Sequence, residues 1–208
     1  MDTHHFPAFP DFAEAAPRIR VRDPLAAFLG AAVDGVIEYQ YADVIKLAGH
    51  SCPSVASAYL MARAALQALY PDTLSERGGV RVELPDPPSE GVSGVIGNVI
   101  GMITGAAGEG GFHGIGSRFD RRDLLAYGGD VPGQVRVSRL DNGAAVSVSV
   151  RTELIPGDAR MRQLLPRCVT GAADAAEAAA FRALWQDRVR RLLLDHADDP
   201  EVVVVQRH

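Results

Sequence analysis

The stretch Gly49-His50-Ser51-Cys52-Pro53 leads directly into an apolar run from Ser54 to Tyr70. Proline suits the first turn of a helix, because its φ is fixed and it has no N–H group to leave unpaired. Apolar residues recur in the run at spacings of three and four, as in a helix with one buried face. We predict a helix that begins beside Cys52 and ends near Tyr70-Pro71-Asp72.

His50 and Cys52 form the strongest candidate for a functional site. A helix N-terminus favours the thiolate, which is the form of cysteine that attacks electrophiles or binds metal ions. Two protein ligands are too few for a stable zinc site, so a metal would need a third ligand such as His113. His4 and His5 are another possible source of a ligand. The alternative that Cys52 is an ordinary packing residue stays open.

The composition is that of an ordinary globular protein: 208 residues, 47% hydrophobic and 23% charged. This length suits one domain with extensions, which we divide into an arm over residues 1–20, a main domain over 21–155 and a helical extension over 156–208. The net charge of −5 argues against nucleic acid or an anionic membrane as a partner. The basic residues Arg188, Arg190 and Arg191 are interpreted as the solvated side of a helix.

Neither a membrane span nor a disulfide framework is expected. No apolar run reaches the roughly 20 residues that cross a bilayer, and the first residues lack a signal-peptide pattern. We therefore expect a cytoplasmic protein. The two cysteines, Cys52 and Cys168, lie far apart in the sequence, so both are expected to be free thiols. Cys168 has no polar neighbour that would activate it, and we interpret it as packing.

Other segments show strand or helix periodicity. Alternating apolar and polar residues predict strands, and Asp141-Asn142-Gly143 predicts an antiparallel hairpin because Asn-Gly favours tight hairpin turns. Asp23-Pro24 is typical of a helix start. The predicted strands are 36–41, 80–84, 135–140, 144–154 and 202–205, the last an edge strand or a dimer contact; the predicted helices are 25–29, 42–47, 91–104, 158–169 and 172–196.

A glycine-rich loop follows the helix predicted for residues 91–104. The segment Gly105–Gly116 holds six glycines in twelve residues, so its backbone can adopt positive φ and present N–H groups to a ligand. It is neither a P-loop nor a dinucleotide-binding fingerprint. We predict that Gly108, Glu109, Gly110 and Gly111 contact a small-molecule ligand, with His113 also pointing inward. The alternative is a surface loop without a ligand.

Taken together, the Gly49–Pro53 motif, the Val-Arg-Val-Glu strand, the glycine-rich helix and Thr104-Gly105 resemble the FmdE-like family, which takes its name from a component of formylmethanofuran dehydrogenase. The resemblance covers roughly residues 20 to 155. It implies an α+β fold in which helices pack on a mixed, largely antiparallel sheet in two layers. It also implies a homodimer, a metal such as zinc or another divalent transition metal near His50 and Cys52, and a molybdenum or tungsten enzyme as a possible partner.

The chain departs from the family pattern in the glycine loop. Ala106 stands where the family has a cysteine, and Gly108-Glu109-Gly110 stands for Gly-Lys-Gly. With only two cysteines, a Cys₄ or iron–sulfur centre is excluded. A site with one metal ion held by His50, Cys52 and a third residue is still possible.

Two functions remain open at this point. The first is a metal-binding accessory protein, in which His50 and Cys52 hold the metal and the glycine loop covers a small ligand. The second is an enzyme with Cys52 as nucleophile or zinc ligand, and with Glu109 or Glu38 as general base. A family member that has lost its metal is a third alternative.

Overall fold

The computed structural model describes residues 9–208, so His4 and His5 lie outside the described part of the chain. Five strands form one sheet in the order β5-β4-β6-β7-β8, and three form a second in the order β2-β1-β3. The strands are β1 Ile19–Arg22, β2 Val36–Tyr39, β3 Ser75–Glu76, β4 Val80–Leu84, β5 Leu125–Tyr127, β6 Val135–Arg139, β7 Ala145–Val150 and β8 Val203–Arg207.

The helices are interspersed with these strands along the chain. Five of the described α-helices contain eight to seventeen residues, and the other two, near the start, are shorter. They are α1 Phe12–Ala15, α2 Pro24–Leu29, α3 Tyr41–Ala48, α4 Pro53–Leu69, α5 Ser93–Thr104, α6 Met161–Val169 and α7 Ala175–Arg190, with 3-10 turns at Val33–Gly35 and Thr152–Leu154 and a π-helical turn at Arg191–Asp195.

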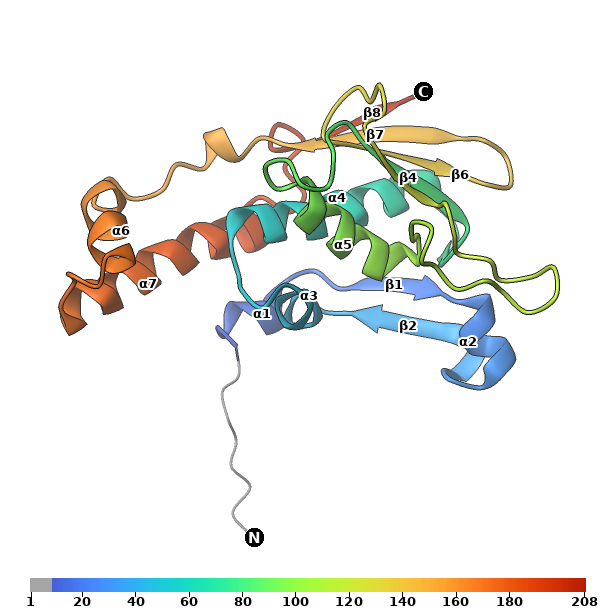
Figure 1. The fold of residues 1–208 in the computed structure, drawn as a ribbon, viewed down its shortest axis with the longest axis horizontal. Helices are drawn as coiled ribbons and strands as arrows, with labels where there is room; N and C mark the ends of the chain where they lie inside the picture. The colour runs from blue at the N-terminus through green and yellow to red at the C-terminus, as the bar shows by residue number, and fades with distance from the viewer. Residues whose placement is uncertain (1–8) are drawn as a thin grey trace, which may run out of the picture.

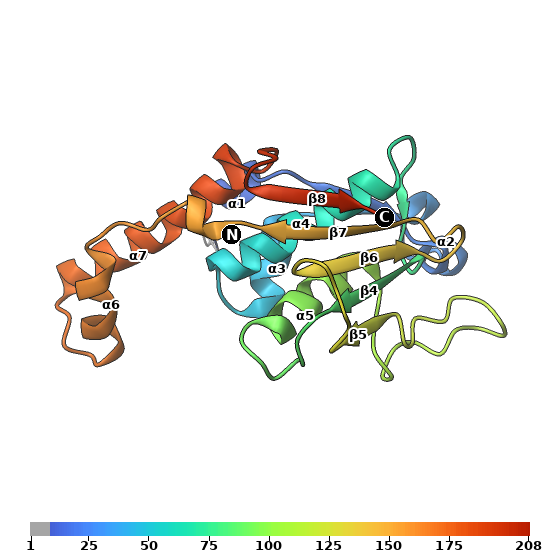
Figure 2. The same cartoon turned by 90° about the horizontal axis from the view of Figure 1, so that it is seen from above.

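The fold is α+β with mixed, largely antiparallel sheets, as the family resemblance implied. Only the pairs β1–β3 and β4–β5 are parallel among the described strands. Figure 1 shows α4 and α5 lying beneath the five-stranded sheet, with β1 and β2 on their other side. The predicted two layers therefore describe the large sheet and its helices, while the small sheet adds a third layer. Figure 2 shows the strand order of the large sheet from above.

Helix α4 occupies the centre of the molecule. It begins at Pro53, directly after Cys52, as predicted. The prediction of a single buried face is wrong for its first half, because every residue from 55 to 62 is buried. The reason is its position between two layers: the Tyr59 hydroxyl donates to the carbonyls of Pro17 (2.6 Å) and Tyr39 (3.1 Å) beside the small sheet. Small alanines on α4 allow this close packing on both sides.

The glycines of α5 mark close approaches, as their positions predicted. A Cβ on Gly101 would lie 2.7 Å from the carbonyl oxygen of Ala106, and one on Gly97 would clash with the Tyr127 hydroxyl. The chain after α5 therefore folds back tightly against the helix. This arrangement positions the glycine loop.

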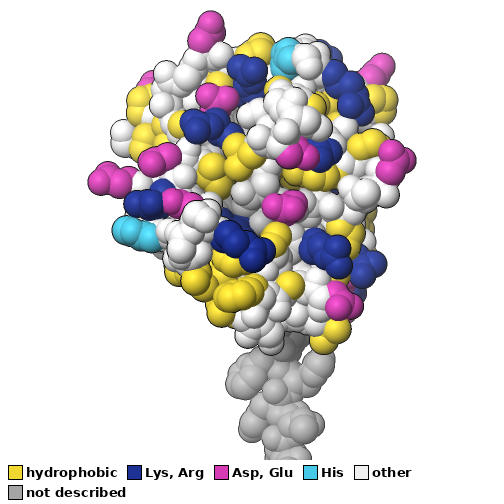
Figure 3. Space-filling model, turned by 90° about the vertical axis from the view of Figure 1, so that its right-hand side faces the viewer, with side chains coloured by type: hydrophobic (Ala, Val, Ile, Leu, Met, Phe, Trp, Pro, Cys, Tyr) yellow, Lys and Arg dark blue, Asp and Glu magenta, His cyan; other side chains and the backbone are white. Residues whose placement is uncertain are grey.

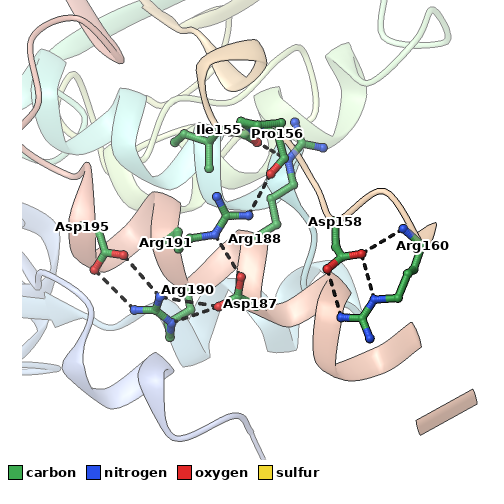
Figure 4. Close-up of polar contacts among 9 residues, drawn as sticks. All are labelled: Ile155, Pro156, Asp158, Arg160, Asp187, Arg188, Arg190, Arg191 and Asp195. Atoms are coloured by element: carbon green, nitrogen blue, oxygen red, sulfur yellow. Dashed lines mark hydrogen bonds and ion pairs between the residues drawn. The ribbon is translucent and has the colours of Figure 1, made fainter. Parts of the chain in front are cut away.

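Arginines at the end of α7 and just after it bind the connection that follows β7 (Figure 4). Arg188 donates to the carbonyls of Ile155 (2.7 Å) and Thr152 (2.8 Å), and Arg191 donates to that of Pro156 (2.8 Å). The interpretation of these arginines as a solvated face is therefore wrong for Arg188 and Arg191. They satisfy backbone carbonyls of the connection that leads out of the large sheet.

Both ends of the described chain join the core. The predicted arm over residues 1–20 includes α1 and the start of β1, and Ala13, Ala16 and Ile19 are buried in the hydrophobic core. The tail forms β8, which pairs antiparallel with β7 at the edge of the large sheet, so the predicted edge strand is confirmed.

The surface charge and the composition of the helices relate to two kinds of partner, nucleic acids and membranes. Figure 3 shows acidic and basic side chains interspersed over the face that lies at the right-hand side of Figure 1, without one large basic area. Within residues 9–208, no helix combines the length and apolar composition needed to cross a bilayer.

Candidate functional site

The corner between α3 and α4 fixes the orientation of His50. Gly49 ends α3 in the left-handed conformation (φ 72°), which turns the chain sharply toward α4. Nδ1 of His50 lies 2.9 Å from the carbonyl oxygen of Ala48. A carbonyl can only accept a hydrogen bond, so in the neutral imidazole Nδ1 carries the proton and Nε2 has a free lone pair.

The free nitrogen of His50 faces the sulfur of Cys52. Sγ lies 3.4 Å from Nε2, and the Val55 N–H in the first turn of α4 donates to Sγ at 3.5 Å. Cys52 is the N-cap of α4, so its sulfur lies where the unpaired N–H groups of the helix favour negative charge. The predicted pairing of these two side chains is present, and the thiol is half-buried while the imidazole is exposed.

A cavity of about 720 Å³ opens beside this corner, lined by His50 and Ser51 but not by Cys52. Phe181 and Trp185 of α7 form an aromatic wall, with ring centroids 5.7 Å apart. Lys46 and Arg182 contribute positive charge. The lining residues come from three parts of the chain: Phe9 and Pro10; Ile45, Lys46, Gly49, His50 and Ser51; and Phe181, Arg182, Trp185 and Gln186.

Ser51 is held from two sides, which fixes the corner relative to α7. Trp185 Nε1 and Gln186 Nε2 both donate to the Ser51 carbonyl, at 2.9 and 3.1 Å. The Ser51 hydroxyl lies 3.1 Å from the hydroxyl of Tyr41, and burial raises the pKa of that tyrosine, so it stays protonated. The sequence pattern placed Trp185 on a packing face and did not predict these contacts. The one signal was that the protein's single tryptophan carries an N–H that needs an acceptor when buried.

The other predicted site residues do not join this corner. His113 is exposed in the glycine loop. It lies near Asp120, and its charge is one of the smaller causes that lower the pKa of that carboxyl group. Among the described residues, no group of three His, Cys, Asp or Glu side chains could hold a metal ion. The expectation that His113 completes a site with His50 and Cys52 therefore has no support in the fold.

The suggested general bases also lie elsewhere. Glu38 forms an ion pair with Arg18 at 2.6 Å on the small sheet, and Glu109 is exposed on the glycine loop. Neither lines the cavity beside His50. The side chain that contacts the Cys52 sulfur is that of His50, at 3.4 Å.

The glycine loop lines a different cavity. Of the four residues predicted to contact a ligand, Gly108 lines a space of about 510 Å³ beside α5, whereas Glu109, Gly110 and Gly111 do not. The two cavities share no lining residue. The structure thus separates two stretches that were expected to form one site.

The prediction that both cysteines are free thiols is confirmed, but the interpretation of Cys168 as packing is not, because α6 has no buried residue. Cys52 and Cys168 are both free thiols, and Cys168 lies on α6, away from the corner in the sequence and outside both cavities.

Comparisons with known proteins add no assignment. No model of a known protein family matches the chain. A search among curated proteins finds no match either. The class of protein that the fold and the site define is an α+β protein with a cysteine–histidine pair at the N-terminus of its central helix.

Proposed function

We propose that Cys52 and His50 form a thiol–imidazole pair that acts on a small molecule bound in the adjacent cavity. The observation that carries this proposal is the 3.4 Å distance between Sγ and Nε2, with the lone pair of Nε2 fixed by the hydrogen bond of Nδ1 to Ala48. A nucleophile and its base within hydrogen-bond reach, with the base oriented by a third group, are the parts that covalent catalysis requires.

Each group has a defined part in such a reaction. Nε2 of His50 accepts the proton of the thiol, and Sγ forms a bond to an electrophilic carbon of the ligand. The imidazolium then returns the proton to the departing group or to the atom that gains the electron pair. The N-terminus of α4 stabilises the negative sulfur before attack.

The lining of the cavity indicates the kind of ligand. Phe181 and Trp185 offer flat apolar surface. Arg182 offers positive charge, and Lys46 adds to it although Asp43 pairs with Lys46 at 3.2 Å. A small molecule with an aromatic or apolar body and an acidic group would meet both.

The rate of thiol alkylation tests this proposal. We would measure the reaction of iodoacetamide with Cys52 at pH 7 in a Cys168→Ser background, which leaves one thiol. The additional change His50→Gln should slow the reaction at least about tenfold, because a base in contact with the thiol is removed. His113→Gln is the matched control and should leave the rate unchanged. Equal rates with and without His50 would rule out the pair.

A bound metal is a second candidate, favoured by the same distance. Two ligands of one tetrahedral zinc, with Zn–S of about 2.3 Å and Zn–N of about 2.0 Å, lie roughly 3.5 Å apart. Histidine ligands also commonly donate their other N–H to a carbonyl, as His50 does. No third protein ligand is present among residues 9–208, so it would come from His4 or His5, from a second copy or from a small molecule.

Elemental analysis separates the two candidates. Untagged protein purified without chelator, together with His50→Ala and Cys52→Ala variants, would be analysed for zinc and other divalent transition metals. About one ion per chain that is lost in both variants would establish the metal site. Protein without metal that still shows fast, His50-dependent alkylation would establish the thiol site.

The resemblance to the FmdE-like family is also a proposal. It is supported by the α+β fold and by the position of the Gly-His-x-Cys-Pro motif directly before the central helix. Light scattering of the purified protein would test the homodimer that the resemblance implies. A dimer would also offer a source for the missing metal ligand.

A further inference from the structure

The second cavity has a charge pattern that the proposed function does not use. It has a volume of about 510 Å³ and lies between α5 and the glycine loop. Its charged lining side chains are Arg77 and Arg121, and no carboxylate of the described residues lines it. The remaining lining is mostly glycine, alanine and aliphatic residues, with the amide of Asn98 as a further polar group.

Arg121 is buried and incompletely paired. Its side chain is 7% exposed, and its Nη2 donates to Oδ1 of Asp23 at 2.8 Å. Nε and Nη1 are fully buried and have no hydrogen-bond partner among the described residues. A buried donor without an acceptor costs free energy, so such a group calls for an explanation.

The position of Arg121 is built into the backbone. Its guanidinium packs against two glycines with positive φ: a Cβ on Gly105 would lie 2.7 Å from Nη1, and one on Gly78 would overlap the guanidinium. Side chains at these positions would exclude Arg121. The absence of side chains at these two glycines therefore leaves the space that the buried guanidinium occupies.

One carboxylate serves both arginines. Asp23 accepts from Arg121 and, at 2.8 Å, from Arg77, and it also accepts from the backbone N–H groups of Leu25 and Ala26. Two positive charges thus share one buried negative charge. On the far side of the arginines, Glu76 and Asp120 line a smaller cavity, but Glu76 is exposed and Asp120 is engaged by Arg122.

We propose that the second cavity binds an oxyanion, the phosphate or carboxylate group of a small molecule, against Arg77 and Arg121. The anion supplies the negative charge that the two arginines lack. Its oxygens contact Arg77, whose side chain is 24% exposed, whereas the fully buried Nε and Nη1 of Arg121 act on it through their charge. Arginine suits this role because its planar donors match carboxylate and phosphate oxygens. The glycine and alanine lining leaves room for the rest of the ligand. This site uses none of the residues of the thiol–imidazole corner, so either can fail without the other.

Titration calorimetry with inorganic phosphate and, separately, with succinate tests the proposal. Both are added at constant ionic strength, with chloride as the reference ion. We expect saturable binding of at least one of them, and Arg77→Met should weaken it at least about tenfold because a charge-assisted hydrogen bond is lost.

A second pair of variants leaves the Asp23 cluster untouched. Leu47 lines the cavity and is 46% exposed, so substitution there is compatible with folding. Leu47→Glu places a negative charge at the cavity and should weaken anion binding severalfold, while Leu47→Gln, which has the same shape without the charge, should preserve it.

The two probes distinguish the sources of the anion. Binding of phosphate alone assigns a phosphorylated ligand, and binding of succinate alone assigns a carboxylic acid. Absence of binding by both, or binding that is unchanged in Arg77→Met and Leu47→Glu, would overturn the proposal and leave the cluster a structural one.

Discussion

At the scale of single residues, Asp23 has two roles that its sequence context revealed only in part. It caps α2 through the N–H groups of Leu25 and Ala26, as Asp23-Pro24 predicted. It also neutralises part of the charge of Arg77 and Arg121, which lie 54 and 98 residues further along the chain. The cap is a local property, whereas the ion pairs depend on the fold.

Replacing Asp23 by Asn should destabilise the protein by roughly 3 kcal/mol, because it leaves a buried arginine without its counter-charge. Urea unfolding at pH 7 would measure the loss. Asp141→Asn is the control: it removes an exposed ion pair with Arg139 and should cost much less. Similar losses in the two variants would contradict the buried cluster.

The same carboxylate gives a pH dependence with a defined sign. Burial raises the pKa of Asp23, but hydrogen bonds from Arg77 and the Ala26 N–H and the charge of Arg121 outweigh it, so the pKa is lowered overall. A lowered pKa in the folded state stabilises the protein above the unfolded value of about 4, and this stabilisation disappears as the pH falls through the folded value. The free energy of unfolding should therefore fall less between pH 6 and pH 3 in Asp23→Asn than in the wild-type protein.

At the scale of elements, two helices end in the same way but in different surroundings. Gly49 ends α3 with φ 72° and Gly105 ends α5 with φ 75°. Nothing lies within 4 Å of a Cβ on Gly49, whereas a Cβ on Gly105 would meet Arg121 and Arg77. A substitution at Gly49 therefore adds backbone strain alone, whereas one at Gly105 adds both backbone strain and a steric clash.

Gly49→Ala should cost about 1 kcal/mol, the strain of a left-handed alanine. Gly105→Ala should cost about 1 to 3 kcal/mol more, since the guanidinium must also move. Thermal or chemical unfolding of both variants measures the difference. Equal costs would mean that Arg121 is not fixed against this glycine.

The elements also show how far the sequence predicts the fold. Predictions that rest on local sequence are confirmed: α4 begins at Pro53, Asn142-Gly143 lies in the turn between β6 and β7, and Gly101 lies at a close approach of the chain. The short strands β1, β3 and β5 were missed, because two to four residues carry little periodicity and depend on their partners. In the candidate site, the pairing of His50 with Cys52 was local and predictable. The aromatic wall and the separation of the glycine loop from the corner arise from long-range packing.

At the scale of the whole molecule, β8 forms one edge of the large sheet and pairs with β7. Val202 accepts from the Arg151 N–H (2.9 Å), and His208 donates to the Ala145 carbonyl (3.0 Å). Backbone groups of an antiparallel strand point alternately toward and away from the partner, so those of Val204 point toward β7 and those of Val205 point outward.

This alternation gives a prediction for proline substitutions. Val204→Pro removes a ladder hydrogen bond and should cost about 1 to 3 kcal/mol more than Val205→Pro, whose N–H faces outward. Chemical unfolding would measure both, and light scattering would report association through an unpaired edge. The reverse order of stability would contradict the register of β8.

The hydrogen bond from Trp185 to Ser51 joins residues that are 134 positions apart. A ribosome that adds about 5 to 20 residues per second needs on the order of 10 seconds to pass from one to the other. During that interval the Ser51 carbonyl lacks both of its donors, Trp185 and Gln186. The corner before α4 is therefore among the last parts of the molecule to be fixed, although it is made in the first third of the chain.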